Sequence, residues 1–342
     1  MSSIGPLIEP RRRITLDHLA GQVVAIDAMN ALYQFLAIIR LRDGAPLRDR
    51  HGMVTSHLQG LFYRTINLLE HGIRPVYVFD GKPPALKQRE LEKRRETKEK
   101  FEREWREALA RGDLVAAFKK AVMTARLTTP MIEEARKLLN YMGVPCIQAP
   151  SEGEAQLAYM VQKKQVDAAG SQDYDSLLFG CPRLILNLTI AGKKYFPKRG
   201  IAVPLVPEEV LLNQVLQQLG ISREQLIEIA MLVGTDYNEG IKGVGPKRAL
   251  QLIKRFGTVE RVANYLGVRL TFDPEEVRRI YLQPAVTDDY HIGWKEPQYD
   301  RIYELLVEQH DFSADRVRRG LQRLHQAWIR LSTRVRRLPL DG

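Results

Sequence analysis

Short apolar runs along the chain predict the strands of a buried sheet. Four such runs occupy positions 23–26, 75–79, 166–171 and 184–187. Their apolar residues are largely consecutive rather than alternating, which is typical of strands that are covered on both faces. Segments with helical periodicity, such as 55–70 and 131–142, separate these runs. We therefore predict an α/β fold with a central, mostly parallel sheet and helices on both faces.

Three further segments predict helices of a more polar kind. Residues 87–107 hold nine Lys or Arg and seven Glu, with many i,i+4 pairs and little apolar stripe. Pro83 and Pro84 start this helix directly after a predicted strand. It is therefore either a solvated surface helix or a mobile element over a site at the strand end. Helices are also expected in 208–233 and, strongly basic, in 315–337.

Acidic residues follow three of the predicted strands. Asp27 and Asp80 follow the first two, and Gln172-Asp173-Tyr174-Asp175 follows the third. The carboxyl ends of parallel strands meet at one sheet edge, where open α/β sheets place their sites. A single Asp in this position commonly caps the next helix. Several on one edge repel each other unless a cation lies between them.

The motif Ser151-Glu152-Gly153-Glu154 adds two more carboxylates. Its first and last residues have the spacing of a capping box that opens a helix over 155–162. The box leaves the middle Glu and the Gly unexplained, and Gly is a poor helix former. Glycine there would allow a second backbone or a metal ion to approach. Two Glu in a first turn also suit the helix dipole, so both interpretations stay open.

Seven acidic residues form the candidate metal site. One of them, Asp236, closes a mostly apolar helix. The set is Asp27, Asp80, Glu152, Glu154, Asp173, Asp175 and Asp236. Oxygen ligands without nearby Cys or His suit magnesium or manganese rather than zinc. Two such ions side by side are the usual device for attack of water on a phosphodiester.

A glycine turn between two predicted helices is a candidate phosphate clamp. Gly243-Val244-Gly245 precedes Pro246, which favours the first position of a helix. Free N–H groups at such a helix start bind phosphate, and basic residues surround the turn. A clamp of this kind reads no base sequence. The alternative is an ordinary helix end with a glycine C-cap.

Composition narrows the class of protein. The 342 residues are 44% hydrophobic, which is enough for a core and excludes global disorder. The net charge is +11, so nucleic acid is the expected partner. A ribosome-associated or membrane-surface protein would have similar charge. Two cysteines exclude a disulfide scaffold. No run is apolar and long enough for a signal peptide or a membrane span, which predicts a soluble intracellular protein.

Five segments together resemble a known family: AIDAMNALYQFL, TSHLQGLFYRTINLLEHGIRPVYVFDGKPP, QAPSEGEAQLAYM, GSQDYDSLLFG and GTDYNEGIKGVGPKRAL. They are similar to the structure-specific flap endonucleases of the 5′ nuclease superfamily, the xeroderma pigmentosum G-like group. The match covers about 21–256 and continues through PAVTDDY and HDFSADRVRRGL to about 327. The resemblance implies a PIN-like fold and removal of 5′ flaps at duplex junctions, in Okazaki-fragment maturation and repair. It also implies 5′–3′ exonuclease activity.

The resemblance further implies the cofactors. Asp27, Asp80, Glu152 and Glu154 would serve one Mg²⁺, and Glu154, Asp173, Asp175 and Asp236 a second. Mn²⁺ would substitute for Mg²⁺. With DNA bound, carbonyl groups near Gly240 and Ile241 would hold K⁺.

Roles in catalysis and DNA binding come from the same resemblance. Lys87 and Arg94, two helical turns apart on one face, would polarise the scissile phosphate, and Tyr33 would stack on a base. Thr55 and Phe312 fall where the family builds a pocket for a one-nucleotide 3′ flap. The implied DNA contacts are Arg40, Thr55, Arg64, Gly240, Ile241, Gly243, Gly245, Lys247, Arg248 and Phe312.

The expected organisation is one nuclease domain, 1–342, in five regions. These are an N-terminal nuclease region (1–98), a helical arch (84–130), an internal nuclease region (131–225), a helix–two-turn–helix element (226–262) and a C-terminal region with a basic tail (263–342). The expected partner is branched DNA with a 5′ flap. We expect the protein to bind this DNA as a monomer, without association with a membrane. An archaeal-looking source implies the cytoplasm, and a eukaryotic one the nucleus.

Three departures from the family pattern stand out. Ser2 replaces the usual Gly, and His310 stands where relatives can carry Lys in the 3′-flap pocket. Gln322 and Trp328 have the spacing of a motif that binds the sliding clamp PCNA, but His325 fills its aliphatic position. Clamp binding stays open, and the tail would otherwise bind duplex phosphates.

Three other functions compete with flap cleavage. A gap or Holliday-junction nuclease belongs to the same superfamily, a junction-binding protein would lack catalysis, and a PIN-type RNA nuclease shares the acids at the sheet edge. The seven acids argue against a non-catalytic protein. The arch and the clamp argue against an RNA nuclease.

Overall fold

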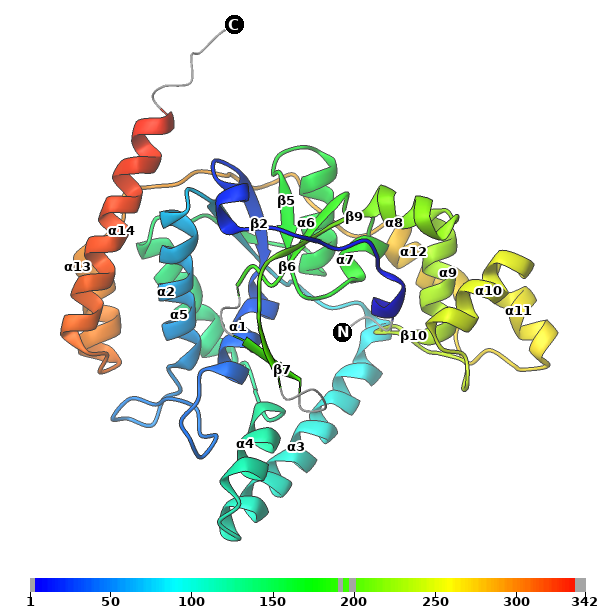
Figure 1. Cartoon of the computed structure of the whole chain (residues 1–342), viewed down its shortest axis with the longest axis horizontal. Helices are drawn as coiled ribbons and strands as arrows, with labels where there is room; N and C mark the ends of the chain where they lie inside the picture. Colours follow the sequence, from blue (N-terminus) through cyan, green and yellow to red (C-terminus); the bar gives the residue numbers. More distant parts are fainter. Residues whose placement is uncertain (1–3, 190–192, 197–200, 336–342) are drawn as a thin grey trace, which may run out of the picture.

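The computed structural model describes residues 4–189, 193–196 and 201–335 (Figure 1). Its central sheet has seven strands in the order β1-β9-β6-β5-β2-β3-β4. Their bounds are β1 Arg12–Arg13, β2 Val23–Asp27, β3 Arg74–Phe79, β4 Cys146–Gln148, β5 Ala168–Gly170, β6 Arg183–Leu186 and β9 Glu208–Leu211. Strands β4, β3, β2, β5 and β6 pair in parallel, while β9 runs antiparallel to β6 and β1. The predicted α/β class and the four predicted strands are confirmed.

Successive residues of β2 point into two separate cores. Val24 and Ile26 pack into one apolar cluster, and Ala25 packs into the other. This alternation is the two-residue period of a strand, and here both faces are covered. The first cluster includes residues of α1 (Ala28–Ile38), α2 (Ser56–Glu70), α5 (Thr129–Tyr141) and α14 (Ala314–Val335). The second includes residues of α6 (Gly153–Gln162), α7 (Asp175–Leu178) and α9 (Arg223–Val233).

The prediction of one helical stretch over 208–233 is wrong at its start. Residues 208–211 form the strand β9, and helices α8 (Leu212–Leu219) and α9 follow. Glu209, only 4% exposed, pairs through its carboxylate with Arg183 on β6 at 2.8 Å and with Arg12 on β1 at 2.7 Å. Pairing with a neighbour on each side overrides the helical pattern of the segment, because tertiary context outweighs local propensity.

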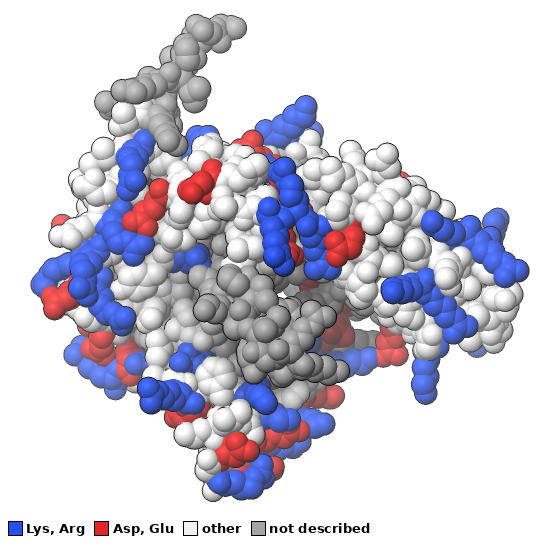
Figure 2. Space-filling model, in the orientation of Figure 1, with Lys and Arg blue, Asp and Glu red and all other residues white. Residues whose placement is uncertain are grey.

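Two helical elements project from the sheet (Figure 1). One is the arch, formed by the short helix η3 (Ala85–Lys87), the long α3 (Gln88–Ala110) and α4 (Leu114–Val122). The other contains the hairpin of β10 (Gly234–Thr235) and β11 (Asn238–Glu239), then α10 (Pro246–Phe256) and α11 (Val259–Leu266). Figure 2 shows Lys and Arg side chains over the arch and over both flanks of the molecule.

The remaining elements complete the cover of the sheet and its edges. They are η1 (Gly5–Leu7), η2 (Leu16–Leu19), the hairpin β7 (Lys193–Phe196) with β8 (Ile201–Pro204), α12 (Pro274–Leu282), α13 (Tyr299–Tyr303) and a π-helical turn (Glu304–Gln309). Ser2 and the tail beyond 335 lie outside the described residues. Within the described part of the chain, no helix is long and apolar enough to cross a membrane.

Candidate active site

Asp27 and Asp80 are fixed at the carboxyl ends of adjacent strands. Asp27 ends β2 and caps α1, because its Oδ1 accepts a hydrogen bond from the Asn30 amide at 2.9 Å. Asp80 follows β3, and its Oδ1 accepts from the Gly153 amide at 2.8 Å. Asp27 therefore caps a helix, as a strand-end Asp commonly does, and it also belongs to the acidic edge.

The close approach of Asp80 explains Gly153. A Cβ atom at this position would lie 2.6 Å from Asp80 Oδ1, so any other residue would displace the carboxylate. The predicted capping box of Ser151 and Glu154 is wrong: α6 begins at Gly153 with Glu152 as its N-cap, and the N-cap side chain makes no capping hydrogen bond. An acid from a different strand takes the first amide of the helix instead.

A second group of acids surrounds Ser171. One carboxylate oxygen each from Glu154, Asp173 and Asp175 lie within 4.8 Å of one another. The Ser171 hydroxyl is 3.1 Å from Glu154 Oε1 and 3.4 Å from Asp27 Oδ2, and it accepts from the Asp173 amide at 3.1 Å. Ser171 thus links three acids. Sequence reasoning missed it, although it stands directly before the Gln172–Asp175 motif.

Burial and mutual repulsion raise the pKa values of Asp27 and Glu154. Burial first, and then the charge of Asp80, raises the pKa of Asp27 to about 7. Burial, followed by Asp173 and Asp175, raises the pKa of Glu154 well above its ordinary value. A cation placed among these oxygens would reverse both effects. An all-oxygen donor set of this kind fits hard divalent ions, as the sequence predicts.

Lys87 and Arg94 extend from the arch to the remaining two acids. Lys87 Nζ lies 2.5 Å from Glu152 Oε2 and 3.3 Å from Asp236 Oδ2. An Arg94 guanidinium nitrogen lies 2.5 Å from Asp236 Oδ1, and its Nε lies 3.0 Å from Glu90. The two cations therefore share a face, as their spacing predicts. Burial disfavours the charged form of Lys87, yet Glu152 and Asp236 raise its pKa overall.

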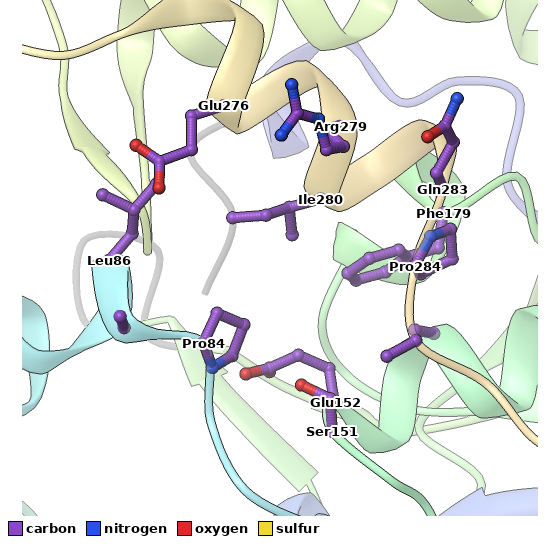
Figure 3. Close-up of a pocket in the computed structure, with 13 residues that line it drawn as sticks. Pro84, Leu86, Ser151, Glu152, Phe179, Glu276, Arg279, Ile280, Gln283 and Pro284 are labelled. Carbon is purple, nitrogen blue, oxygen red and sulfur yellow. The ribbon is translucent and has the colours of Figure 1, made fainter.

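Two cavities flank the base of the arch. The first, of about 380 Å³, lies beside Glu152 and is shown in Figure 3, where Leu86 and Ile280 face each other across it. The second, of about 550 Å³, lies on the Asp236 side. Ala85 and Leu86 line both. The short segment that carries Lys87 therefore stands between two open spaces.

The residues expected to contact DNA lie around this centre rather than in it. Tyr33, on α1, is 36% exposed, and Lys98 of the arch lies 4.6 Å from the centre of its ring. The guanidinium of Arg40 donates to the carbonyls of Leu36 and Gly44, both at 2.8 Å. Arg64 Nε donates to a carbonyl at 3.0 Å, and its side chain lines a separate cavity between α1 and α2. Both arginines are thus anchored to backbone groups.

Thr55 and Phe312 flank a buried polar cluster. Thr55 precedes α2 and is 4% exposed, and Phe312 packs against the apolar cluster around α2. Between the two segments, His310 contacts Asp49 at 2.9 Å and Glu134 at 3.2 Å. His310 therefore joins three parts of the chain.

The helix–two-turn–helix element has tight backbone packing. A Cβ atom at Gly240 would lie 2.2 Å from the Val233 carbonyl oxygen, and Gly243 has a φ of +81°. Gly245 is the N-cap of α10, which starts at Pro246 as predicted. The C-cap alternative is wrong, because Gly234 ends the preceding helix and the β10–β11 hairpin intervenes.

Basic side chains surround this turn. Lys242, Lys247 and Arg248 are exposed, and Arg248 donates to the Gly243 carbonyl at 3.2 Å. The Ile241 amide donates to the Leu232 carbonyl at 2.8 Å, which fixes the turn against α9. The amides at the start of α10 are therefore presented beside positive charge, as a phosphate site requires.

The C-terminal residues with clamp-motif spacing lie in a continuous helix. Gln322, His325 and Trp328 all belong to α14, and His325 Nδ1 lies 3.0 Å from the Tyr299 hydroxyl. The segment is therefore part of the folded domain.

Comparison with known proteins identifies the family. Residues 1–101 match the XPG N-terminal domain, and residues 143–236 match the XPG I-region. Flap endonuclease 1 of Pyrococcus abyssi is 54% identical over 325 residues, which cover 95% of this chain and 94% of that protein. Flap endonuclease 1 of Ignicoccus hospitalis is 53% identical over 328 residues, which cover 95% of this chain and 93% of that protein.

Solved structures agree with this assignment. Flap endonuclease-1 from Methanococcus jannaschii superimposes with a TM-score of 0.77 at 41% identity, over 98% of this chain and all of that one. The catalytic core of Rad2 in complex with a DNA substrate matches with a TM-score of 0.68 at 27% identity, over 94% of this chain and 97% of that one. The chain therefore belongs to the flap endonuclease 1 family of XPG-type, metal-dependent nucleases.

Proposed function

We propose that this flap endonuclease binds DNA at a junction with a 5′ flap and hydrolyses one phosphodiester near the junction, using two divalent ions. The observation that carries the proposal is that acidic and basic side chains meet at one sheet edge. Carboxylates from strand ends and helix starts converge there, and the arch cations Lys87 and Arg94 face two of them. The complex of the related Rad2 core with DNA supports DNA as the partner.

We assign the acids to two ions. Asp27, Asp80, Glu152 and Glu154 are assigned to one Mg²⁺, and Glu154, Asp173, Asp175 and Asp236 to the other, with Mn²⁺ as a substitute. When bound, the ions would supply charge neutralisation for the phosphate and activation of the attacking water. The Ser171 hydroxyl contacts both Glu154 and Asp27 and so holds these two acids in place.

Lys87 and Arg94 are the proposed catalytic cations. Each already lies within 2.5 Å of a carboxylate oxygen, so each can reach an anion at the same place. A fixed positive charge there stabilises the charge that develops on a phosphate oxygen in the transition state. Tyr33, exposed nearby on α1, would stack on a base. Such stacking does not depend on the base sequence, because every base has a flat face.

Duplex DNA would be held by its backbone. Amides at the start of α10, with Lys247 and Arg248, would bind phosphates, and carbonyls at Gly240 and Ile241 are assigned to a bridging K⁺. The remaining assigned contacts are Arg40, Thr55, Arg64, Gly243, Gly245 and Phe312. Phosphate contacts give affinity without sequence preference, as a replication and repair nuclease requires. The archaeal relatives support a cytoplasmic enzyme, which we assign as a monomer.

The first experiment is cleavage of an end-labelled double-flap DNA, with Mg²⁺ and with EDTA. A 3′-flap duplex and a plain single strand serve as substrate controls. We expect one product cut near the junction, only with Mg²⁺ and only from the 5′ flap. Asp175→Ala should bind the same DNA but not cut it. Binding by the wild-type protein without cleavage, under any divalent ion, would contradict the proposal and favour a non-catalytic scaffold.

A further inference from the structure

The arch and the metal site share the same carboxylates. Lys87 contacts both Glu152 and Asp236, and Arg94 contacts Asp236 on its other oxygen. The side chains of Lys87, Glu152 and Asp236 are only 10% to 19% exposed, so their charges are weakly screened. Two arch cations thus neutralise two acids that would otherwise face a divalent ion.

Ion pairs are the main contacts of the base of the arch, beside the partly buried Leu86, which packs against the apolar core. None of the residues of η3 is buried, and Ala85 and Leu86 border an open cavity on each side. Figure 3 shows Leu86 at the edge of one of these cavities, beside Glu276. A further polar contact in the first turns of α3 is the exposed pair of Lys93 and Glu239. If the ion pairs are broken, this segment loses little buried apolar surface.

We propose that Lys87 and Arg94 are the resting counterions of Glu152 and Asp236, so that arch docking and divalent-metal binding compete for the same oxygens. The proposal rests on the assignment of these two acids as metal ligands under the proposed function. Because coupling between two binding events is reciprocal, whatever weakens docking strengthens metal binding. Once a metal ion has displaced them, Lys87 and Arg94 become available to a phosphate. Metal binding by the acids and release of the arch cations are therefore one exchange of partners.

The test measures Mn²⁺ affinity without DNA, by electron paramagnetic resonance of the free ion near pH 8. Lys87→Met keeps a long side chain without its charge, and Lys87→Arg restores the charge. Arg95→Met is the matched control, since Arg95 lies on the same helix, is exposed and pairs with Glu99. We expect Lys87→Met to bind Mn²⁺ about fivefold more tightly than wild type, with Lys87→Arg and Arg95→Met within about twofold.

Two results would overturn the proposal. If Lys87→Met binds Mn²⁺ as weakly as wild type, or more weakly, the cations do not compete with the metal. If wild type binds no Mn²⁺, the metal assignment itself fails together with the competition. Asp175→Asn separates these cases, because it should weaken Mn²⁺ binding whether or not the arch competes. Circular dichroism of each variant confirms that the affinities refer to folded protein.

Discussion

At the scale of single residues, several acids have a structural task in addition to their place in the site. Asp27 ends a strand and caps a helix, and Asp80 accepts the first amide of α6. Their positions are therefore fixed by backbone contacts before any ion binds. Gly153 belongs to the same arrangement, since its missing side chain is what lets Asp80 approach.

Gly153→Ala is expected to lower cleavage activity more than stability. The new Cβ would lie 2.6 Å from Asp80 Oδ1 and push the carboxylate away, whereas alanine itself is favourable in a helix. We expect a loss of about tenfold or more in single-turnover rate and a change in unfolding free energy of about 1 kcal/mol or less. Ser151→Ala is the control, because Ser151 precedes the N-cap residue of α6 and takes no part in capping, so losing its hydroxyl should change neither quantity. Full activity of Gly153→Ala would contradict this account.

Removing metal should make stability fall as pH rises. Burial and Asp80 raise the pKa of Asp27 from 3.8 to about 7, so the folded state holds a proton that the unfolded state has lost. The contribution of this bound proton to the free energy of unfolding is fully present below about pH 4 and is lost as pH rises through about 7. In EDTA, Asp27→Asn keeps a helix-capping oxygen and should exceed wild type near pH 8, by on the order of 2 to 4 kcal/mol.

Denaturant unfolding at several pH values measures this difference. The advantage of Asp27→Asn should shrink toward pH 4, and added Mg²⁺ should stabilise the wild type more than the variant. An advantage independent of pH would show that repulsion at the acidic edge is not its cause.

At the scale of elements, the arch is a polar helix that carries its function at its base. Its exposed face is stabilised by i,i+4 pairs such as Arg95 with Glu99 and Arg106 with Glu102. Away from the base, the Trp105 indole donates to the Asp43 carbonyl at 3.1 Å, which places the arch against the loop after α1. The element thus delivers two cations to the sheet edge, while Leu86 packs against the core at its base.

Arg94→Ala should slow the chemical step far more than it weakens binding. We expect single-turnover cleavage to fall by about 100-fold, because the charge acts on the transition state, while the Kd for flap DNA changes by less than about fivefold. Stopped-flow binding and quench-flow cleavage on the same substrate separate the two effects. Arg95→Ala is the matched control. A proportional loss of binding would assign Arg94 to DNA affinity instead.

At the scale of the whole molecule, charge is unevenly used. The chain carries +11 overall, yet a group of acids gathers at one sheet edge. Lys and Arg lie over the arch and flanks, interspersed there with other Asp and Glu (Figure 2). A positive surface attracts the DNA backbone, and the acidic centre requires cations before a phosphate can approach. Binding and chemistry therefore depend on salt in different ways.

Affinity for flap DNA should fall steeply with monovalent salt. For about six phosphate contacts, raising salt from about 50 to 200 mM should weaken binding roughly 10³-fold, through counterion release. Lys247→Ala should lower the slope of log Kd against log salt by about 1, whereas Lys119→Ala, on the arch away from α10, should leave it unchanged. Fluorescence anisotropy in Ca²⁺ measures both, and an unchanged slope for Lys247→Ala would contradict the phosphate clamp.

The sequence by itself determined four of the seven strands of the central sheet, the acids at strand ends and the family, because local periodicity and motif spacing carry that information. Only the tertiary structure decided what depends on partners distant in sequence. Such contacts turned 208–211 into a strand, gave the first amide of α6 to Asp80 and brought Ser171 between two acids. They also set Lys87 against Glu152, 65 positions away. Spacing cannot encode these contacts, because their geometry exists only once the sheet has brought the segments together.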